Sequence, residues 1–337
     1  MPDAPADTGS TARFFPVWSL VILALALSFL MGRYPAPYFT NPADLSGDGL
    51  LWRVLVNLRL PRLLSAFVLG MVLSASGMVF QMIFRNPLVD SGFLGVSSGA
   101  AFGASLAIVS LGGAVHVVQG SAAFFACLGL GASYFIARRI RFGGWVLRLV
   151  LSGIAVSAIY TSGTGALKYL ADPIRQLPDI TFWMLGGLWG ITWVDMLHML
   201  PVVVPSIILI YCMRWRLNLL SMRDETAFSL TARPGQERLI LLLAAVVSTA
   251  VVVAKAGQIS WVGLIVPHVS RRLFGSDAQL ALPGALLIGG FFVLLCDDVA
   301  RTVLTGEIPL GILTSFIGAA LFLGLLMSQG IKTGKGT

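Results

Sequence analysis

The sequence predicts an all-α, polytopic membrane protein with about ten transmembrane helices, and three observations lead to this fold class. Hydrophobic residues make up 57% of the 337 residues and charged residues only 11%, against about 25% charged in soluble domains. The apolar residues form runs long enough to cross a hydrocarbon layer of about 30 Å as helices. The charged residues lie in short clusters between these runs. We therefore expect a single transmembrane domain over residues 1–337.

Ten apolar runs are candidate spans. In chain order they cover residues 14–32, 61–83, 93–112, 117–137, 146–167, 193–213, 238–256, 258–270, 279–299 and 310–328. The first run has no small-residue cleavage site before Arg33, so we expect a retained span and not a signal peptide. The run 258–270 is short and contains Pro267, so it is expected to cross only part of the bilayer, shielded by its neighbours.

Small residues recur at every fourth position in two places. Gly95, Gly99 and Gly103 form one series, and Gly186 with Gly190 forms another. This spacing lets helix backbones approach closely in lipid, although glycine is common in membrane helices generally. It predicts helix packing and says nothing about function.

The distribution of charge predicts the orientation. With the amino terminus in the cytoplasm, the internal regions hold 15 of the 23 Lys and Arg residues but only 7 of the 15 acids. Cytoplasmic loops carry the excess of Lys and Arg. We therefore expect a multi-pass protein with both termini in the cytoplasm. The basic residues form no continuous stripe, which argues against nucleic acid as a partner.

Catalytic and metal-binding patterns are missing from the sequence. The cysteines and histidines lie singly, without ligand spacing, at Cys127, Cys212, Cys296, His116, His198 and His268. The glycine-rich tail 330–337 lacks the spacing of a phosphate-binding loop. We expect neither an enzyme nor a bound cofactor or metal. A secondary transporter driven by an ion gradient would normally carry intramembrane acids in a relay, whereas the acids here lie mainly in loops or at helix ends.

Two groups of charges remain. Arg59, Arg62 and Arg301 lie at predicted outer helix ends, with Asp297 one helical turn before Arg301. They could extend to the membrane interface as isolated side chains, or form a basic surface for the acidic side chains of an external partner. The internal loop 214–238 is too polar to span. Its short amphipathic helix could rest on lipid or fit a groove on a cytoplasmic partner.

Several blocks of the chain occur in an order that resembles a known family. They are Arg59-Leu60-Pro61-Arg62 and the segments 85–100, 182–187, 217–220, 263–268 and 306–311. These blocks are similar to those of the FecCD-like permeases of type II ABC importers, which carry iron siderophores, haem and vitamin B12. The resemblance implies a ten-helix permease in the cell inner membrane that works by alternating access. It also implies a second permease copy, an external binding protein and two cytoplasmic ATPase subunits that use ATP and Mg.

The resemblance also implies roles for particular residues. Arg59, Arg62 and Arg301 would receive glutamates of the binding protein, and Asn86, Pro87 and Leu88 would narrow the path at its cytoplasmic end. Contacts with the ATPases would come from Leu219, Ser221, Met222, Arg223, Asp224, Glu225, Ala227 and Leu230. The translocation path would include Ser152, Ser157, Thr161, Thr314 and Ser315. The chain departs from the family at Arg223 and Thr231, where glycine is common, and it has two acids, Asp297 and Asp298, where the family commonly has one.

The cargo implied by this resemblance is a metal chelate: a ferric siderophore, haem or cobalamin. An oxyanion such as molybdate or tungstate is the alternative within the same family, because relatives that share these blocks carry such ions. Selection among these cargoes lies mostly in the separate binding protein.

Overall fold

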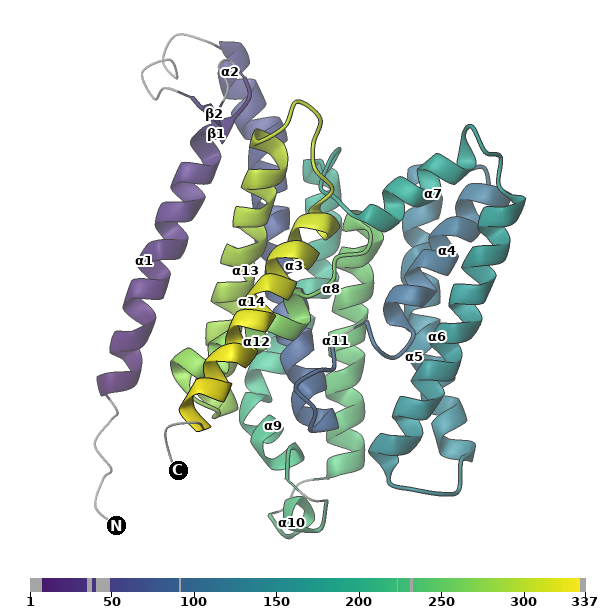
Figure 1. Ribbon diagram of the computed structural model, residues 1–337, viewed down its shortest axis with the longest axis vertical. Helices are drawn as coiled ribbons and strands as arrows, with labels where there is room; N and C mark the ends of the chain where they lie inside the picture. Colours follow the sequence, from purple (N-terminus) through teal and green to yellow (C-terminus); the bar gives the residue numbers. More distant parts are fainter. Residues whose placement is uncertain are drawn as a thin grey trace.

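The computed structural model describes residues 8–34, 38–40, 49–90, 92–222, 224–230 and 233–333. Two short strands, β1 (Met31–Gly32) and β2 (Tyr38–Phe39), pair antiparallel after the first helix. Nearly all other regular structure is helical (Figure 1). The helices are α1 (Thr8–Leu30), α2 (Gly49–Val54), α3 (Leu60–Phe84), α4 (Val96–Ser110), α5 (Val115–Arg139), α6 (Trp145–Leu170), α7 (Gln176–Leu185), α8 (Trp193–Cys212), α9 (Arg214–Leu220), α10 (Asp224–Ser229), α11 (Pro234–Ala256), α12 (Val262–Phe274), α13 (Ala278–Thr302) and α14 (Leu310–Thr333), with a π-helical turn, η2 (Leu55–Arg59), before α3.

The predicted all-α membrane fold is confirmed, and each predicted span corresponds to one helix. Within the described residues, seven helices are long and apolar enough to cross a membrane. Among the other predicted spans, α4 and α12 have only 15 and 13 residues. Helix α12 begins at Val262 and not at residue 258, because Gly257 (φ 70°) ends α11, residues 258–260 form no helix and Trp261 is left-handed (φ 73°).

The span predicted from residue 61 is part of a longer helix. Residues Gly49–Phe84 form one continuous helix of 36 residues. Pro61 has no N–H for an α-helical bond to the carbonyl of Asn57, and the turn before it is π-helical, with the Leu60 N–H bonded to the Leu55 carbonyl. The helix ends where Arg85 adopts a left-handed conformation (φ 54°), one residue before the restrictive pair Asn86-Pro87.

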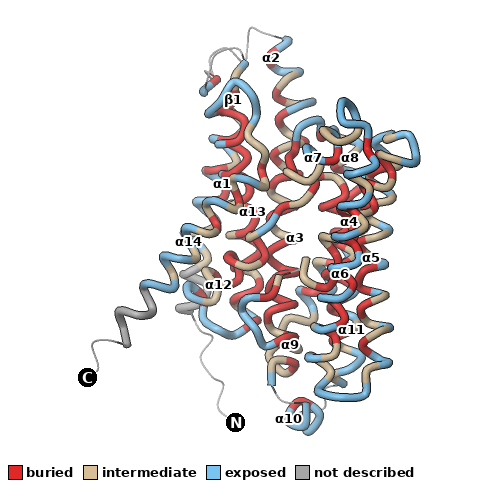
Figure 2. The backbone as a smooth tube through the Cα atoms, turned by 45° about the vertical axis from the view of Figure 1, so that its right-hand side comes forward, coloured by how far each residue is buried: buried red, intermediate tan, exposed pale blue. Residues whose placement is uncertain are grey.

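Helix α3 is the centre of the molecule and is buried along its length (Figure 2). Two of its glycines touch the backbone of neighbouring helices. A Cβ on Gly70 would lie 2.0 Å from the Gly289 carbonyl oxygen in α13, and a Cβ on Gly77 would lie 1.9 Å from that of Gly263 in α12. No side chain fits at either contact.

The predicted glycine contacts are confirmed for one series and wrong for the other. Gly99 packs on α5, where a Cβ would lie 2.4 Å from the Phe125 carbonyl oxygen, and Gly103 packs equally closely on Ser121. Gly186 and Gly190 do not form a helix face, because α7 ends at Leu185 and both glycines lie in the following loop with positive φ.

The two ends of the molecule differ. Helices α9 and α10 lie at one end, which we call the α10 end, and the β1–β2 pair and α2 lie at the other, the β1 end (Figure 1). The start of α1 and the end of α14 both lie toward the α10 end. The chain therefore crosses between the two ends an even number of times.

Candidate functional site

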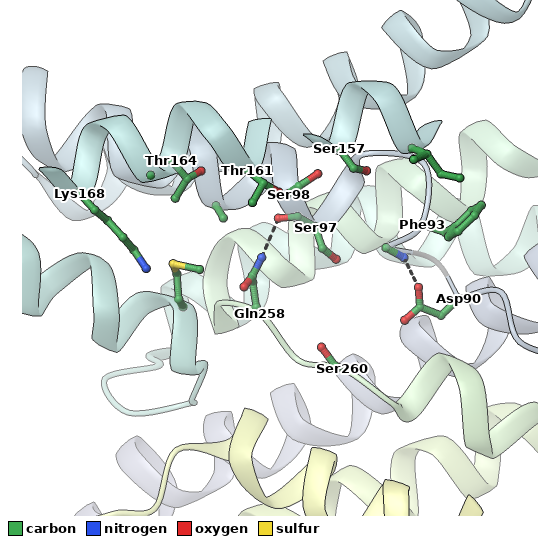
Figure 3. A pocket seen from close by; sticks show the side chains of 15 residues that line it. Asp90, Phe93, Ser97, Ser98, Ser157, Thr161, Thr164, Lys168, Gln258 and Ser260 are labelled. Carbon is green, nitrogen blue, oxygen red and sulfur yellow. Dashed lines mark hydrogen bonds between the residues drawn. The ribbon is translucent and has the colours of Figure 1, made fainter. Parts of the chain in front are cut away.

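An open cavity of about 680 Å³, the main cavity, lies between α4, α6 and the non-helical segment after α11 (Figure 3). Its polar lining comes largely from hydroxyl groups. The lining residues are Asp90, Gly92, Phe93, Ser97, Ser98, Ala101, Ile154, Ser157, Thr161, Thr164, Gly165, Lys168, Met184, Gln258 and Ser260. Volumes of about 300–1,000 Å³ are typical of sites for drug-sized ligands, so the main cavity can hold part or all of a small organic molecule.

The non-helical segment 257–261 forms one wall of this cavity. The Gln258 amide donates to the Ser97 carbonyl at 2.9 Å, which ties the segment to the first turn of α4. The Gly187 N–H bonds to the Ala256 carbonyl at 2.8 Å, and the Leu310 N–H bonds to the Gly186 carbonyl at 2.9 Å. Irregular backbone at membrane depth is tolerated where protein buries it or where it borders a cavity, and this segment satisfies both conditions.

The five residues predicted for a translocation path divide into two groups. Ser157 and Thr161 line the main cavity, and Ser315 lines an adjoining cavity of about 630 Å³ that shares Met184, Gln258 and Ser260 with it. Ser152 and Thr314 are buried, and their hydroxyls donate to backbone carbonyls of their own helices. Only the first group is open to a molecule in either cavity.

The three arginines predicted for docking border one pocket of about 490 Å³ at the β1 end. Arg59 and Arg62 are three residues apart in the sequence, and the fold brings the distant Arg301 to them. Arg59 is 7% exposed, and its guanidinium donates to the Tyr34 carbonyl at 2.6 Å and the Thr40 hydroxyl at 3.1 Å. These bonds fix the chain after α1 against the π-helical turn.

Arg62 and Arg301 belong to a network with three acids. Arg62 donates to Asp297 at 2.9 and 3.0 Å and to Glu307 at 2.8 Å. Arg301 pairs with Asp298, which also accepts from Ser28. The predicted pair of Asp297 and Arg301 is present at 3.8 Å but is the longer contact.

The internal partners limit how these arginines could meet another protein. The side chain of Asp297 is 1% exposed and that of Arg62 14%, while the side chain of Glu307 is 39% exposed. The Arg62–Glu307 pair is therefore the part of the network that is open to the pocket. The docking role itself stays a prediction.

A second ionic cluster lies at the α10 end. Asp224, the first residue of α10, accepts from Arg85 at 2.9 Å and from Arg238 at 2.7 and 3.1 Å. Arg85 also donates to the Met222 carbonyl. Asp224 thereby connects the end of α3, the loop before α10 and the start of α11. The bonds from Arg238, and then those from Arg85, lower the pKa of the Asp224 carboxyl below its ordinary value of 3.8.

The predicted gate residues form an exposed turn beside this cluster. The Leu88 N–H bonds to the side-chain oxygen of Asn86 at 2.9 Å, which shapes the turn around Pro87. Asn86 and Pro87 line a small pocket of about 220 Å³ together with Ser221. The predicted gate and the predicted coupling loop therefore lie next to each other.

The predicted coupling loop forms two short helices, α9 and α10. Met222 and Leu230 are exposed and Leu219 is half-buried, so a partner could reach them. Ala227 is fully buried, so its side chain packs inside the loop and is not available for the predicted contact. Arg223 and Thr231 lie outside the described residues. Phe228, to which no sequence pattern assigns a role, is 74% exposed on α10 and is a large apolar side chain in a charged loop.

Several residues of the main cavity were also not assigned a role from the sequence. Ser97 and Ser98 lie within a block quoted above, but Lys168 and Gln258 have no local pattern that points to a cavity. Burial raises the pKa of the Asp90 carboxyl, and the hydrogen bond from the Gly92 N–H opposes this effect.

Within the described residues, no group of three His, Cys, Asp or Glu side chains could hold a metal ion.

Comparisons with known proteins agree over nearly the whole chain. Residues 20–328 match the model of the FecCD transport family. The chain is 39% identical to a probable iron chelatin transport system permease protein of Helicobacter pylori, over 86% of each chain. It is 37% identical to the hemin transport system permease protein HmuU of Yersinia pestis, over 91% of this chain and 93% of that protein. A solved structure described as an inward-facing conformation of a metal-chelate type ABC transporter matches with a TM-score of 0.85, at 34% identity over 93% of this chain and 98% of that one.

Proposed function

Because the chain belongs to the FecCD transport family, we propose that it is the permease subunit of an ATP-binding-cassette importer that moves a metal chelate into the cytoplasm. The observation that carries the proposal is the family match over residues 20–328, together with a polar cavity between membrane helices. The chain supplies the path, and ATP hydrolysis takes place in a separate subunit.

A second copy of the permease would complete the path. The main cavity and its neighbour open between α6 and α14, and these helices expose large apolar side chains such as Ile159 and Phe316. Polar groups at membrane depth face a protein interior or a water-filled cavity and not lipid. A two-fold related copy packed on α6 and α14 would cover the hydroxyl-lined surface and join two half-paths into one.

The size of the path favours a chelate over a bare oxyanion. One protomer contributes cavities of about 680 and 630 Å³, within the range of about 300–1,000 Å³ for drug-sized ligands. A molybdate or tungstate ion is far smaller and would contact few of the lining groups at once. Ferric siderophores, haem and corrinoids are of suitable size, and the oxyanion is the alternative cargo.

The two ends of the molecule suit different partners. The excess of Lys and Arg supports an orientation with the α10 end in the cytoplasm and the β1 end outside. An external binding protein would meet the arginine pocket at the β1 end, and two ATPase subunits would meet α9 and α10. Binding of a partner at either end would favour one of two arrangements of the helix bundle. The difference between the partner's affinities for these two arrangements determines how far the equilibrium shifts.

The test of this function is uptake into proteoliposomes that contain the permease, its co-encoded ATPase and its binding protein. We expect accumulation of a ferric siderophore, haem or cobalamin that requires ATP on the ATPase side. Accumulation of molybdate and of no chelate would show that the cargo is an oxyanion, the alternative considered above. Uptake that ignores ATP and the binding protein but follows an imposed ion gradient would contradict the importer assignment.

The docking surface predicts that two substitutions change the affinity for the binding protein in opposite directions. Replacing Arg62 with glutamine should weaken binding-protein affinity by about tenfold and reduce its salt dependence, because a charge that steers and pairs with an acidic partner is lost. Replacing Glu307 with glutamine should strengthen binding, because Glu307 competes for the same guanidinium. Titration of the labelled binding protein at several salt concentrations measures both effects.

The matched control for docking is Arg53→Gln. Arg53 is exposed in α2 at the same end but does not line the arginine pocket. Equal affinities for the Arg62 and Arg53 variants would remove Arg62 from the docking surface.

The ionic cluster at the α10 end gives a prediction for coupling. Replacing Asp224 with asparagine removes the charged acceptor shared by Arg85 and Arg238, so movement of α10 should reach the gate turn less effectively. We expect the ratio of cargo taken up to ATP hydrolysed to fall about fivefold while ATPase activity persists. Arg141→Gln is the control, because Arg141 is exposed in the loop between α5 and α6 and is not part of this cluster. An unchanged ratio in the Asp224 variant would contradict the coupling role.

The same cluster predicts a pH range. A carboxyl whose pKa is lowered by folding contributes stability above its unfolded pKa and loses it as the pH falls through its folded pKa. The Asp224 contribution is therefore present at neutral pH and is lost only below about pH 4. The wild-type ratio of uptake to hydrolysis should stay constant between about pH 6 and 8 if Asp224 is the controlling group.

A further inference from the structure

One basic side chain of the transmembrane region has no partner among the described residues. Lys168 lies in the last turn of α6, near the β1 end. Its side chain lines the main cavity, and its ammonium group points toward the open space (Figure 3). It makes no hydrogen bond or ion pair with any described residue.

The lack of a partner for Lys168 contrasts with the other intramembrane lysine. Lys255 also lies at a helix end, but it pairs with Asp195 at 2.6 Å and with the Gln119 side chain at 2.5 Å. Basic groups within membrane segments normally pair with one another or with backbone carbonyls, or mark a substrate pathway. Lys168 fits the last case, because it borders a cavity and lacks the first two kinds of partner.

The rest of the cavity lining also favours negative charge. The first turn of α4, including Ser97 and Ser98, borders the cavity, and the start of a helix carries partial positive charge. The Ser98 hydroxyl is buried and makes no hydrogen bond with any described residue, so its donor is unused within the protein. Ser157 and Thr161 add further hydroxyl donors.

The acidic lining residue lies away from Lys168. Asp90 is the one carboxylate among the lining residues, and Figure 3 shows it at the opposite side of the cavity from Lys168. One oxygen of Asp90 accepts from the Gly92 N–H at 3.0 Å. The cavity therefore has a positive end near the β1 end of α6 and a negative end near the α3–α4 connection.

We propose that, among the cargoes that the binding protein delivers, the main cavity favours the passage of an anion, and that Lys168 is the residue that attracts its charge. This inference rests on the proposed import function and narrows its substrate class. An anionic chelate, such as a ferric hydroxycarboxylate complex or haem with its two propionates, would pass in preference to a neutral ferric hydroxamate. A single ammonium with weak hydroxyl donors attracts an anion without holding it tightly, and passage requires that a cargo both enter and leave.

The first test compares an anionic with a neutral iron chelate in the assembled importer. Lys168→Gln should reduce ATP-dependent uptake of ferric citrate at low concentration by about tenfold and leave uptake of ferrichrome within about twofold. Lys168→Arg keeps the charge and should restore most of the ferric citrate uptake. Selectivity of the unchanged binding protein cancels in each ratio of variant to wild type.

The matched control is Arg175→Gln, which removes an exposed charge seven residues further along that does not line the cavity. This variant should leave both uptake rates unchanged. Equal losses of both chelates in Lys168→Gln would indicate a structural role for Lys168, and no loss of ferric citrate uptake would indicate no role. Either result overturns the proposal.

The second test does not depend on transport. The chain contains four lysines, so acylation of Lys168 by an amine reagent can be followed by mass spectrometry of the permease in nanodiscs, with the paired Lys255 as reference. Ferric citrate should protect Lys168 from acylation and ferrichrome should not. Equal protection by both, or by neither, overturns the anion site. If protection is selective but no chelate is taken up with ATP, the import function is wrong and the anion site stands.

Discussion

Replacing Asp297 with leucine is expected to lower the free energy of unfolding by about 3–5 kcal/mol, because removal of one partner leaves a buried charge uncompensated. Asp297 is fully buried and holds Arg62 through three hydrogen bonds, with Arg301 nearby. Among the acids, Arg62 would then keep only Glu307, which is exposed, and Arg301 only Asp298. Reversible unfolding in mixed detergent micelles, followed by tryptophan fluorescence or circular dichroism, measures the change.

A double variant separates the ion pair from the packing. Exchanging Asp297 and Arg62 together for leucine removes both charges, and replacement of a buried pair by apolar side chains is often close to neutral. The double variant should therefore be more stable than the single Asp297 variant. If Asp297→Leu alone were as stable as the wild type, the network would not contribute to the stability of the fold.

Adding one methyl group at Gly77 should destabilise the protein by about 3 kcal/mol or more, because overpacking forces the backbone to move. The new Cβ of Gly77→Ala would lie 1.9 Å from the Gly263 carbonyl oxygen. That atom is backbone and cannot move aside as a flexible side chain could. We expect a lower unfolding midpoint in the same assay and poor recovery of folded protein on size-exclusion chromatography.

The control for this substitution is Gly131→Ala in α5, where a Cβ meets nothing within 4 Å. Alanine favours helix over glycine by about 1 kcal/mol in exposed positions, so this variant should be neutral or slightly more stable. A Gly77 variant with the stability of the Gly131 variant would contradict the close contact between α3 and α12.

The sequence was sufficient to predict the fold class, because an apolar run of about 20 residues crosses lipid as a helix that satisfies its own backbone hydrogen bonds. Each of the ten runs corresponds to one helix of the structure. The short run 258–270 lies largely in α12, which continues to Phe274. Exact helix starts were harder to predict. Pro61 indicated a start for α3, but a π-helical turn accommodates it, and such a local change in backbone bonding has no signal in hydropathy. Helix α7 was not predicted, since it is short and lies between two spans.

The candidate site was predictable only in part, because partners across the fold are not visible in one sequence. Arg59, Arg62 and Arg301 were grouped by position and resemblance, and the structure places them around one pocket. Their bonds to Tyr34, Asp298 and other groups depend on which helices pack together. Lys168 directly follows the predicted span 146–167, but no sequence pattern indicates that it borders a cavity.

The 36 residues of the continuous helix Gly49–Phe84 span about 54 Å at 1.5 Å per residue, whereas the hydrocarbon layer is about 30 Å thick. Much of this helix must therefore stand outside the hydrocarbon, and α2 forms its tip at the β1 end. A partner that docks there would touch a raised protein platform and not the lipid headgroups. Such a partner needs no affinity for membranes, and its complex with the permease should survive replacement of the bilayer by detergent.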